Sequence, residues 1–120
     1  KEAMASAPVL TYDRKDGMQD KWLQQQGLAS RSAPPRHWLP SAHAFVRACE
    51  AGVGWGMQPT LLIQRYLDAG TLVALHPDAD MVVDLYWAHA RNAQAGLERL
   101  TQCVINAARG WLDPLPPAGT

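Results

Sequence analysis

Hydrophobic residues recur at spacings of three and four in several stretches of the chain, and this spacing predicts helices over 16–27, 41–52, 59–70 and 92–112. Short apolar runs with β-branched residues lie between them and predict strands, at 8–12, 37–39, 53–57, 72–75 and 81–88. Helices and strands alternate over most of the sequence. This order indicates an α/β fold, an open and mainly parallel sheet flanked by helices.

Start and stop residues stand at the ends of the predicted helices. Asp16 and Ser41 occupy N-cap positions, where a side-chain oxygen can accept a hydrogen bond from a free first-turn amide. Pro59 starts the third helix, and Asn92 or Asn92-Ala93 opens the last one. Glycine closes the first three helices, at positions 27, 52 and 70.

The segment 81–88, MVVDLYWA, is the longest predicted strand and is apolar on both faces apart from Asp84. A run of this kind predicts a strand covered on both sides. The proline-rich stretch 113–120 predicts a disordered tail. We therefore divide the chain into an α/β part at 1–80, a strand and helix at 81–112, and the tail.

Charge and cysteine content narrow the range of functions. Lysine plus arginine equals aspartate plus glutamate, 11 against 11, which gives no electrostatic reason for direct binding to DNA or to a membrane. No apolar run approaches the about 20 residues of a membrane span. Cys49 and Cys103 lie on apolar helix faces and are expected to be buried, reduced thiols, as in a cytoplasmic protein. The sequence has no visible signal peptide, starts without methionine, and is expected to be a fragment.

No known catalytic constellation is visible. The glycines of 52–56 lie within a predicted strand, without the spacing of a dinucleotide fingerprint. The four histidines are scattered, and none joins the cysteines at zinc spacing. Ser41 lacks the nucleophile elbow of a serine hydrolase. We expect no enzymatic activity, no metal and no cofactor.

Binding chemistry has two candidate positions. The helix after Ser41 presents free amides and a partial positive charge, which can hold an anion such as a carboxylate. The alternative, that Ser41 is only a cap, stays open. Trp38 and Trp55 flank this helix on predicted strands, and either one can offer an aromatic face to a cation or simply fill the core.

Five segments in order carry a family resemblance: PVLTYDRKD at 8–16, PSAHAFV at 40–46, ACEAGVGWGMQP at 48–59, LDAGTLV at 67–73 and LYWAHAR at 85–91. Together they resemble the second half of the effector-binding domain of LysR-type transcriptional regulators, with Gly52, Gly54 and Pro59 in register with the family's signature. The branch that they resemble most senses lysine and arginine and controls amino-acid export.

The resemblance implies a cytoplasmic homo-oligomer with an N-terminal winged helix-turn-helix and a two-lobed sensor similar to type II periplasmic binding proteins. The effector would sit between the lobes. Residues 1–80 would form the second lobe, and 81–112 would return to a first lobe that this sequence lacks. Without it, that segment is expected to cover the second lobe, pair with another copy or lie exposed. DNA would be bound only through the missing N-terminal domain.

The resemblance also implies an effector site. Ser41 and the amides from Ala42 onward would hold the carboxylate of the effector, and His43 and Trp55 would border it. A lysine or arginine effector needs an acid for its side-chain cation, and Asp16 is the candidate. Two other functions stay open at this point, a lobe of a solute-binding protein for transport and a small α/β enzyme.

Overall fold

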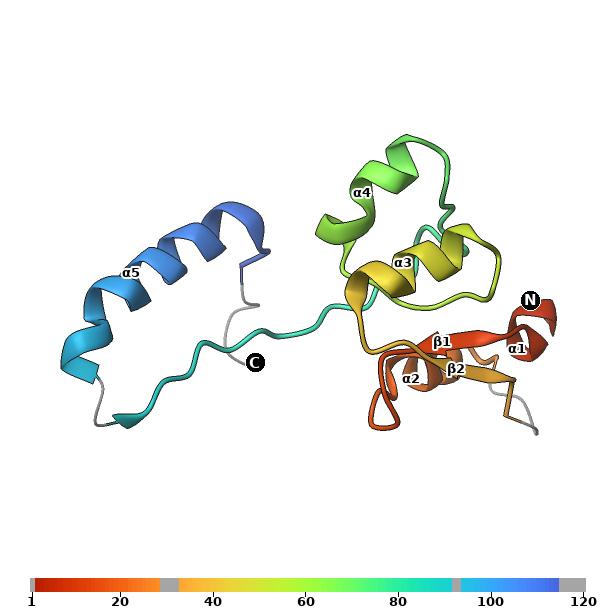
Figure 1. Ribbon diagram of the computed structural model, residues 1–120, viewed down its shortest axis with the longest axis horizontal. Helices are drawn as coiled ribbons and strands as arrows, with labels where there is room; N and C mark the ends of the chain where they lie inside the picture. Colours follow the sequence, from red (N-terminus) through yellow and green to blue (C-terminus); the bar gives the residue numbers. More distant parts are fainter. Residues whose placement is uncertain (1, 29–32, 92–93, 115–120) are drawn as a thin grey trace. The chain divides into compact units, whose positions relative to one another are not determined.

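The computed structural model describes residues 2–28, 33–91 and 94–114 (Figure 1). The chain forms two compact units, Lys1–Met81 and Val82–Thr120. Its elements in chain order are α1 (Glu2–Ser6), β1 (Val9–Thr11), α2 (Met18–Gln25), β2 (Arg36–Trp38), α3 (Ala42–Glu50), α4 (Thr60–Asp68) and α5 (Gln94–Trp111). The sequence analysis did not predict α1.

Strands β1 and β2 form a parallel pair with Val9 opposite Arg36 and Thr11 opposite Trp38. On the other edge of β1, Trp55 makes an isolated parallel bridge to Val9, with its amide donating to the Pro8 carbonyl at 3.0 Å and its carbonyl accepting from the Leu10 amide at 2.7 Å. The predicted parallel sheet flanked by helices is confirmed. The predicted third strand at 53–57 is wrong in extent, because only Trp55 pairs with β1.

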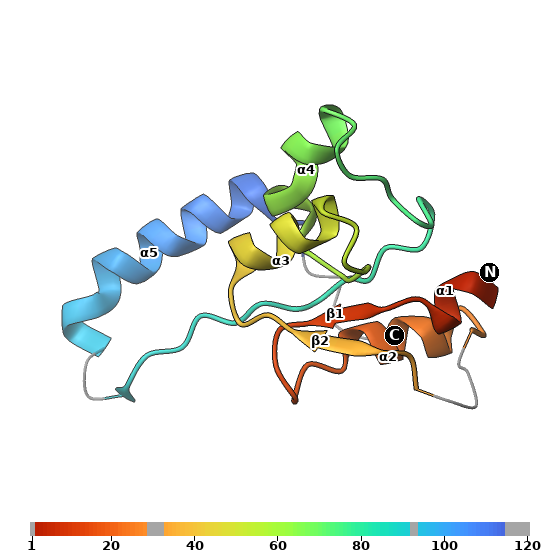
Figure 2. The ribbon, with the colours of Figure 1, turned by 45° about the vertical axis from the view of Figure 1, so that its right-hand side comes forward.

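Helices α2 and α3 lie on opposite faces of the β1–β2 pair, as both ribbon views show (Figures 1 and 2). The core of the first unit consists of apolar side chains from these elements and β1: Val9, Leu10, Trp22, Leu23, Phe45 and Val46. Each is at most 6% exposed, and full burial of such a side chain contributes about 1.5–3 kcal/mol. Their apolar spacing therefore identifies the helix faces that pack on the sheet.

The helix ends confirm most of the predicted boundary residues. Ser41 is the N-cap of α3, and the glycines after α2, α3 and α4 have positive φ, 65°, 73° and 70°. The N-cap of α2 is Gly17, without a side-chain hydrogen bond, so the prediction of Asp16 as the N-cap was wrong by one position. Asp16 still accepts a hydrogen bond from the Met18 amide at 3.2 Å, and so serves a first-turn donor.

Two further predicted strands, 72–75 and 81–88, are absent from the described residues, and both predictions were wrong. Apolar runs form strands only where neighbouring backbone completes their hydrogen bonds. Val73 is 76% exposed and Val82 is 78% exposed, so neither segment is covered. Asp84 is exposed too, and therefore needs no buried partner.

The second unit, Val82–Thr120, contains an extended segment at 82–90 and helix α5. Within it, the Trp87 indole Nε1 donates to Thr101 Oγ1 at 3.1 Å. None of its described residues is buried. Cys103 is exposed, so the prediction of a buried thiol there was wrong. The predicted helix start at Asn92 lies outside the described residues, and so does the predicted tail from 115 onward.

Candidate functional site

The carboxyl ends of β1 and β2 lie side by side and lead into two loops, 12–17 and 39–41. A hydrogen bond from the Leu39 amide to the Thr11 carbonyl, 2.9 Å, holds the second loop against the first strand. Helix α3 starts after this second loop and runs back over the sheet (Figures 1 and 2). Ligands of open α/β sheets bind at this edge, so it is the candidate site.

Ser41 starts α3 as the sequence predicted. Its backbone is extended, with φ −150° and ψ 122°, and its Oγ accepts a hydrogen bond from the Ala44 amide at 3.3 Å. Its carbonyl accepts from the Phe45 amide at 2.9 Å. The serine therefore satisfies one of the free amides of the first turn, and α3 begins at a defined place.

The amides of Ala42 and His43 have no hydrogen-bond acceptor among the described residues. Ser41, Ala42 and His43 are all exposed. No described side chain other than that of Ser41 bonds to this end of the helix. The positive end of the α3 dipole is thus open to solvent and can accept an anion.

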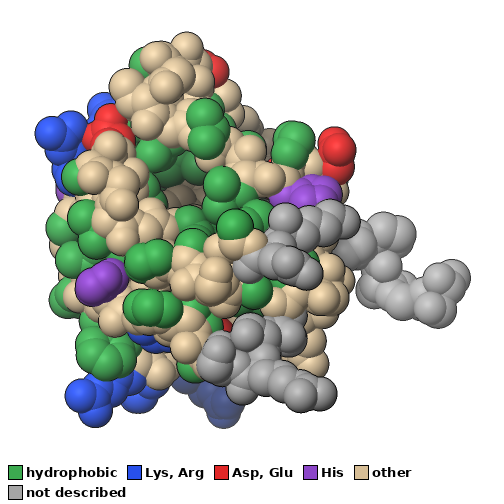
Figure 3. Space-filling model, turned by 90° about the vertical axis from the view of Figure 1, so that its right-hand side faces the viewer, with side chains coloured by type: hydrophobic (Ala, Val, Ile, Leu, Met, Phe, Trp, Pro, Cys, Tyr) green, Lys and Arg blue, Asp and Glu red, His purple; other side chains and the backbone are tan. Residues whose placement is uncertain are grey.

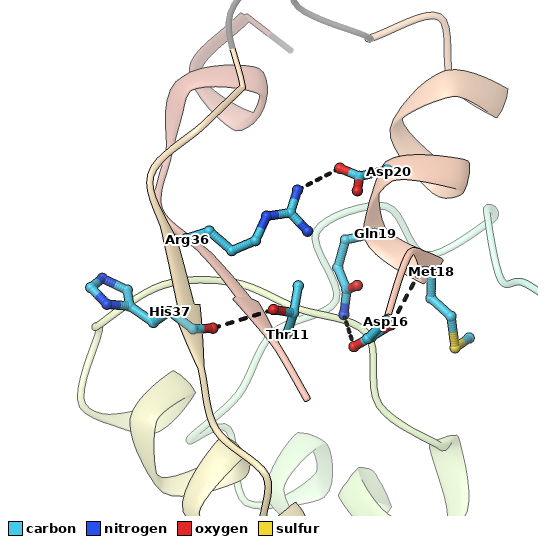
Figure 4. Close-up of polar contacts among 7 residues, drawn as sticks. All are labelled: Thr11, Asp16, Met18, Gln19, Asp20, Arg36 and His37. Carbon is cyan, nitrogen blue, oxygen red and sulfur yellow. Dashed lines mark hydrogen bonds and ion pairs between the residues drawn. The ribbon is translucent and has the colours of Figure 1, made fainter. Parts of the chain in front are cut away.

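Asp16 lies in the other loop at this edge, and its carboxylate is engaged by its own segment. Oδ2 accepts from the Tyr12 amide at 2.8 Å. Oδ2 also accepts from Gln19 Nε2 at 3.4 Å, and Oδ1 accepts from the Met18 amide (Figure 4). These bonds fold the loop between β1 and α2. A carboxylate with three local donors is poorly placed to receive a ligand cation.

Trp55 lies apart from the other candidates. Its ring packs against Trp22 of α2, with 5.6 Å between ring centroids, and Trp22 in turn meets the ring of His76 edge-on at 6.5 Å. The Trp55 Nε1 atom is buried without a hydrogen-bond partner in the described residues. The structure therefore places Trp55 in an aromatic cluster on the α2 side of the sheet.

The first unit contains a cavity of about 470 Å³. Its walls are mostly apolar and come from Trp22 of α2, from α3 and α4, and from the segments that follow each of these two helices. The lining includes Val46, Cys49, Trp55, Ile63, Leu67 and Leu75. Figure 3 shows hydrophobic side chains around a hollow on one side of the molecule. The cavity includes Trp55 but none of Asp16, Ser41, Ala42 and His43. The five predicted site residues therefore do not share one cavity.

The sheet edge also carries a contact between a cation and an aromatic ring, and the part that Arg14 plays in it was not predicted. The Arg14 guanidinium carbon lies 5.2 Å from the centroid of the Trp38 ring. Trp38 ends β2, and Arg14 belongs to the loop after β1. The sequence offered Trp38 and Trp55 as alternatives for a cation in the cleft, and in the structure the protein's own Arg14 lies over Trp38.

Residues 2–28, 33–91 and 94–114 were also searched for metal sites, membrane-spanning helices and reactive thiols. No cluster of three or more His, Cys, Asp or Glu residues there could hold a metal ion. No helix in this part of the chain combines the length and the apolar character that crossing a membrane requires. Burial raises the pKa of the Cys49 thiol, which lines the cavity. A raised pKa keeps the thiol protonated and unreactive at neutral pH.

Comparison with known proteins gives a consistent result over nearly the whole chain. Residues 1–111 match the family model of the LysR substrate binding domain. Among curated proteins, the chain is 35% identical over 114 residues to the HTH-type transcriptional regulator ArgP of Pseudomonas fluorescens Pf0-1, covering 95% of this chain and 38% of ArgP. It is 35% identical over 108 residues to the HTH-type transcriptional regulator LysG of Mycobacterium tuberculosis H37Rv, covering 90% of this chain and 35% of LysG.

Solved structures agree. The C-terminal domains of a LysR family protein from Agrobacterium tumefaciens C58 superimpose with a TM-score of 0.85 at 41% identity, covering 94% of this chain and 54% of that one. Full-length LysG from Corynebacterium glutamicum with bound effector Arg gives a TM-score of 0.71 at 30% identity, covering 92% of this chain and 38% of LysG. The chain thus spans little more than a third of the length of the full regulators that it matches.

Proposed function

Because the chain belongs to the LysR substrate-binding domain family, we propose that it is the effector-sensing part of a LysR-type transcriptional regulator. The observation that carries the proposal is the bare, exposed amide end of α3 at the carboxyl edge of the parallel sheet, in a chain of this family. The relatives above are transcriptional regulators, and they give no support to the transport alternative.

The effector that we propose is a basic amino acid, arginine or lysine. Support comes from the likeness to regulators named ArgP and LysG, and from the LysG structure that is described with bound effector Arg. A carboxylate suits the candidate site, since the free amides of Ala42 and His43 can donate to it and the α3 dipole favours its charge. His43, at the same exposed turn, would border the ligand.

Two of the predicted contacts have a smaller role in this proposal. Trp55 packs on Trp22, and we propose that it supports the sheet from the α2 side. Asp16 has its carboxylate occupied by three donors of its own segment. We propose that Asp16 shapes the loop at the sheet edge and leaves the side chain of the effector to another group.

The sensing mechanism that we propose is a population shift. A ligand that binds one arrangement of the sensor better than another changes the populations of the two by the ratio of its affinities. The regulator would be a cytoplasmic homo-oligomer, without catalytic activity, that contacts DNA through an N-terminal domain. In this scheme α3 reads the α-carboxylate that all amino acids share, and selectivity for a basic side chain arises elsewhere in the site.

Calorimetry with arginine and agmatine tests the proposal, because agmatine keeps the guanidinium and lacks the carboxylate. The purified protein should bind arginine well and agmatine weakly. Ser41→Asp retains an N-cap oxygen but places a negative charge at the proposed carboxylate position, and it should abolish arginine binding. Thr60→Asp is the matched control, because it puts the same charge at the start of α4, and it should leave binding unchanged.

Equal affinity for arginine and agmatine would contradict a carboxylate site at α3. Unchanged arginine binding in Ser41→Asp would remove Ser41 from the site. Absence of arginine and lysine binding in the unmodified protein would overturn the proposed effector class.

A further inference from the structure

Trp38 presents a half-exposed aromatic face at the same edge of the sheet from which α3 starts. Its side chain is 50% exposed, and the residue lies at the carboxyl end of β2, three positions before the cap of α3. Trp22, by contrast, is 6% exposed and packs on Trp55. Of these three tryptophans, only Trp38 combines exposure with a position at the sheet edge.

A cation already occupies this face. The Arg14 guanidinium carbon stands 5.2 Å from the ring centroid, within the range of a cation–π contact. The ion pairs found among the described residues are Arg36–Asp20 and Arg47–Glu50, so Arg14 has no carboxylate partner in that part of the chain. Within the described ranges, the Trp38 ring is therefore the group that attracts Arg14, and exposed contacts of this kind are weak.

The usual alternative for a ligand cation, a free carboxylate in the same loop, is poorly available. Asp16 accepts bonds from Tyr12, Met18 and Gln19, and Asp13 Oδ1 accepts from the amides of Lys15 and Asp16 at 2.7 and 3.0 Å. Both oxygens of Asp16 and one oxygen of Asp13 are thus engaged within this segment. An aromatic face attracts a guanidinium or an ammonium group without needing a carboxylate.

We propose that the Trp38 ring receives the side-chain cation of the basic amino acid and that Arg14 gives up its place on the ring when the effector binds. The inference rests on the proposed function, and it adds a residue that determines specificity. α3 receives the carboxylate and Trp38 the guanidinium or ammonium group. Exchange of one cation for another keeps the ring occupied, so the effector competes with a group of the protein itself.

This competition sets the sign of each variant. Arg14→Gln removes the competitor and a like charge, and should tighten arginine binding by about two- to fivefold. Trp38→Ala removes the face and should weaken arginine binding by a similar or larger factor. Trp38→Phe keeps an aromatic face that attracts a cation less strongly, so its affinity for arginine should lie between those of the unmodified protein and Trp38→Ala. Arg65→Gln is the matched control, because it removes the cation–π contact of Arg65 with Tyr66 on α4, 4.7 Å, and should change nothing.

Citrulline separates a specific role of Trp38 from a structural one. It has the length and shape of arginine but a neutral urea group in place of the guanidinium. The preference for arginine over citrulline, measured by calorimetry, should fall in Trp38→Ala by about two- to fivefold or more. A tryptophan that only supports the loop would weaken both ligands by the same factor. Circular dichroism of each variant confirms that it is folded.

The outcomes are distinct. An arginine-to-citrulline ratio that stays the same in Trp38→Ala and Trp38→Phe, while the protein binds arginine, overturns this inference and leaves the proposed function in place. Weaker arginine binding in Arg14→Gln also overturns it, because Arg14 would then be a ligand for the carboxylate. A protein that binds neither arginine nor lysine overturns both the inference and the proposed function.

Discussion

Gly56 and Phe45 are in such close contact that no side chain fits between them. A Cβ atom built at Gly56 would lie 2.4 Å from Phe45 Cζ and 2.9 Å from the Leu10 carbonyl oxygen. Phe45 is 1% exposed, so its ring is enclosed in the core and has little room to move. The glycine thus allows the backbone after Trp55 to approach β1 and α3 together.

Gly56→Ala should therefore destabilise the fold by about 2–3 kcal/mol, because overpacking of a filled core forces side chains and backbone to shift. Urea unfolding followed by circular dichroism measures the change. Gly17→Ala is the control for space, since no atom lies within 4 Å of a Cβ built at Gly17, and it should cost no more than about 1 kcal/mol, the usual cost of alanine at an N-cap. Equal unfolding midpoints for Gly56→Ala and the unmodified protein would show that the ring can move aside.

Gly54 is in similarly close contact with its surroundings, but its nearest neighbour is backbone and not a side chain. A Cβ at Gly54 would lie 2.6 Å from the Pro8 carbonyl oxygen, which itself accepts the Trp55 amide. Gly54→Val should lower the free energy of unfolding by more than Gly56→Ala. The Pro8 carbonyl cannot move away from the new side chain without disturbing its hydrogen bond with the Trp55 amide. A variant with an unaltered melting temperature would deny the glycine any steric role.

The cap of α3 gives a third prediction, on stability. Ser41→Ala removes the oxygen that accepts from the Ala44 amide, and it should cost about 1 kcal/mol. Ser41→Asp keeps an acceptor and a favourable charge at a helix start, so it should unfold at nearly the same urea concentration as the unmodified protein. If Ser41→Asp instead unfolds as early as Ser41→Ala, loss of arginine binding in that variant would reflect a damaged helix and not charge repulsion.

Apart from the five-residue helix α1, which was missed, the helices were predicted well from the sequence because their signals are local. A cap oxygen, an apolar stripe and a closing glycine all act within one or two turns. The ranges 41–52 and 59–70 accordingly contain α3 and α4, with Ser41, Gly52 and Gly70 in their predicted places. The cap of α2 is shifted from Asp16 to Gly17, and the carboxylate of Asp16 bonds both to the Tyr12 amide and to the first-turn amide of Met18.

Strands were predicted less well because a strand exists only by pairing. The run at 81–88 has the composition of a covered strand, but its hydrogen bonds depend on backbone elsewhere. Tyr86 is 85% exposed, so that partner is not supplied by the described residues. The roles of the site residues were hard to predict for the same reason, since they too depend on distant parts of the chain. Composition cannot distinguish Trp38 from Trp55, since only their positions in the sheet make one exposed and the other packed on Trp22.

The ion pair between Arg36 on β2 and Asp20 on α2, 2.6 Å, joins the sheet to the helix that covers it (Figure 4). The two side chains are 21% and 55% exposed, so water screens much of their attraction. A double-mutant cycle with Arg36→Gln and Asp20→Asn should give a coupling energy of about 0.5–1 kcal/mol that falls at 1 M salt.

The pair Arg47–Glu50, 2.9 Å and within a single helix, is the reference for that cycle, and it should give about 0.3–0.5 kcal/mol. Zero coupling for Arg36–Asp20, or coupling that is indifferent to salt, would show that the contact adds nothing to the docking of α2 on the sheet.

The two cysteines should differ in reactivity. Burial raises the pKa of the Cys49 thiol, so at any pH near neutrality less of it is the reactive thiolate. In a Cys103→Ser variant, iodoacetamide at pH 8 should label Cys49 several-fold more slowly in buffer than in urea, as measured by mass spectrometry. In Cys49→Ser, the exposed Cys103 should react at similar rates in both.

The raised pKa also fixes how this thiol affects stability. The folded protein holds the Cys49 proton more tightly than the unfolded chain does, so the contribution is fully present below the unfolded pKa and is lost as pH rises through the folded pKa. Labelling of Cys49 in buffer should therefore accelerate with pH more steeply than in urea at the alkaline end. Equal rates in buffer and urea at pH 8 would mean that the wall of the cavity at Cys49 opens freely to solvent.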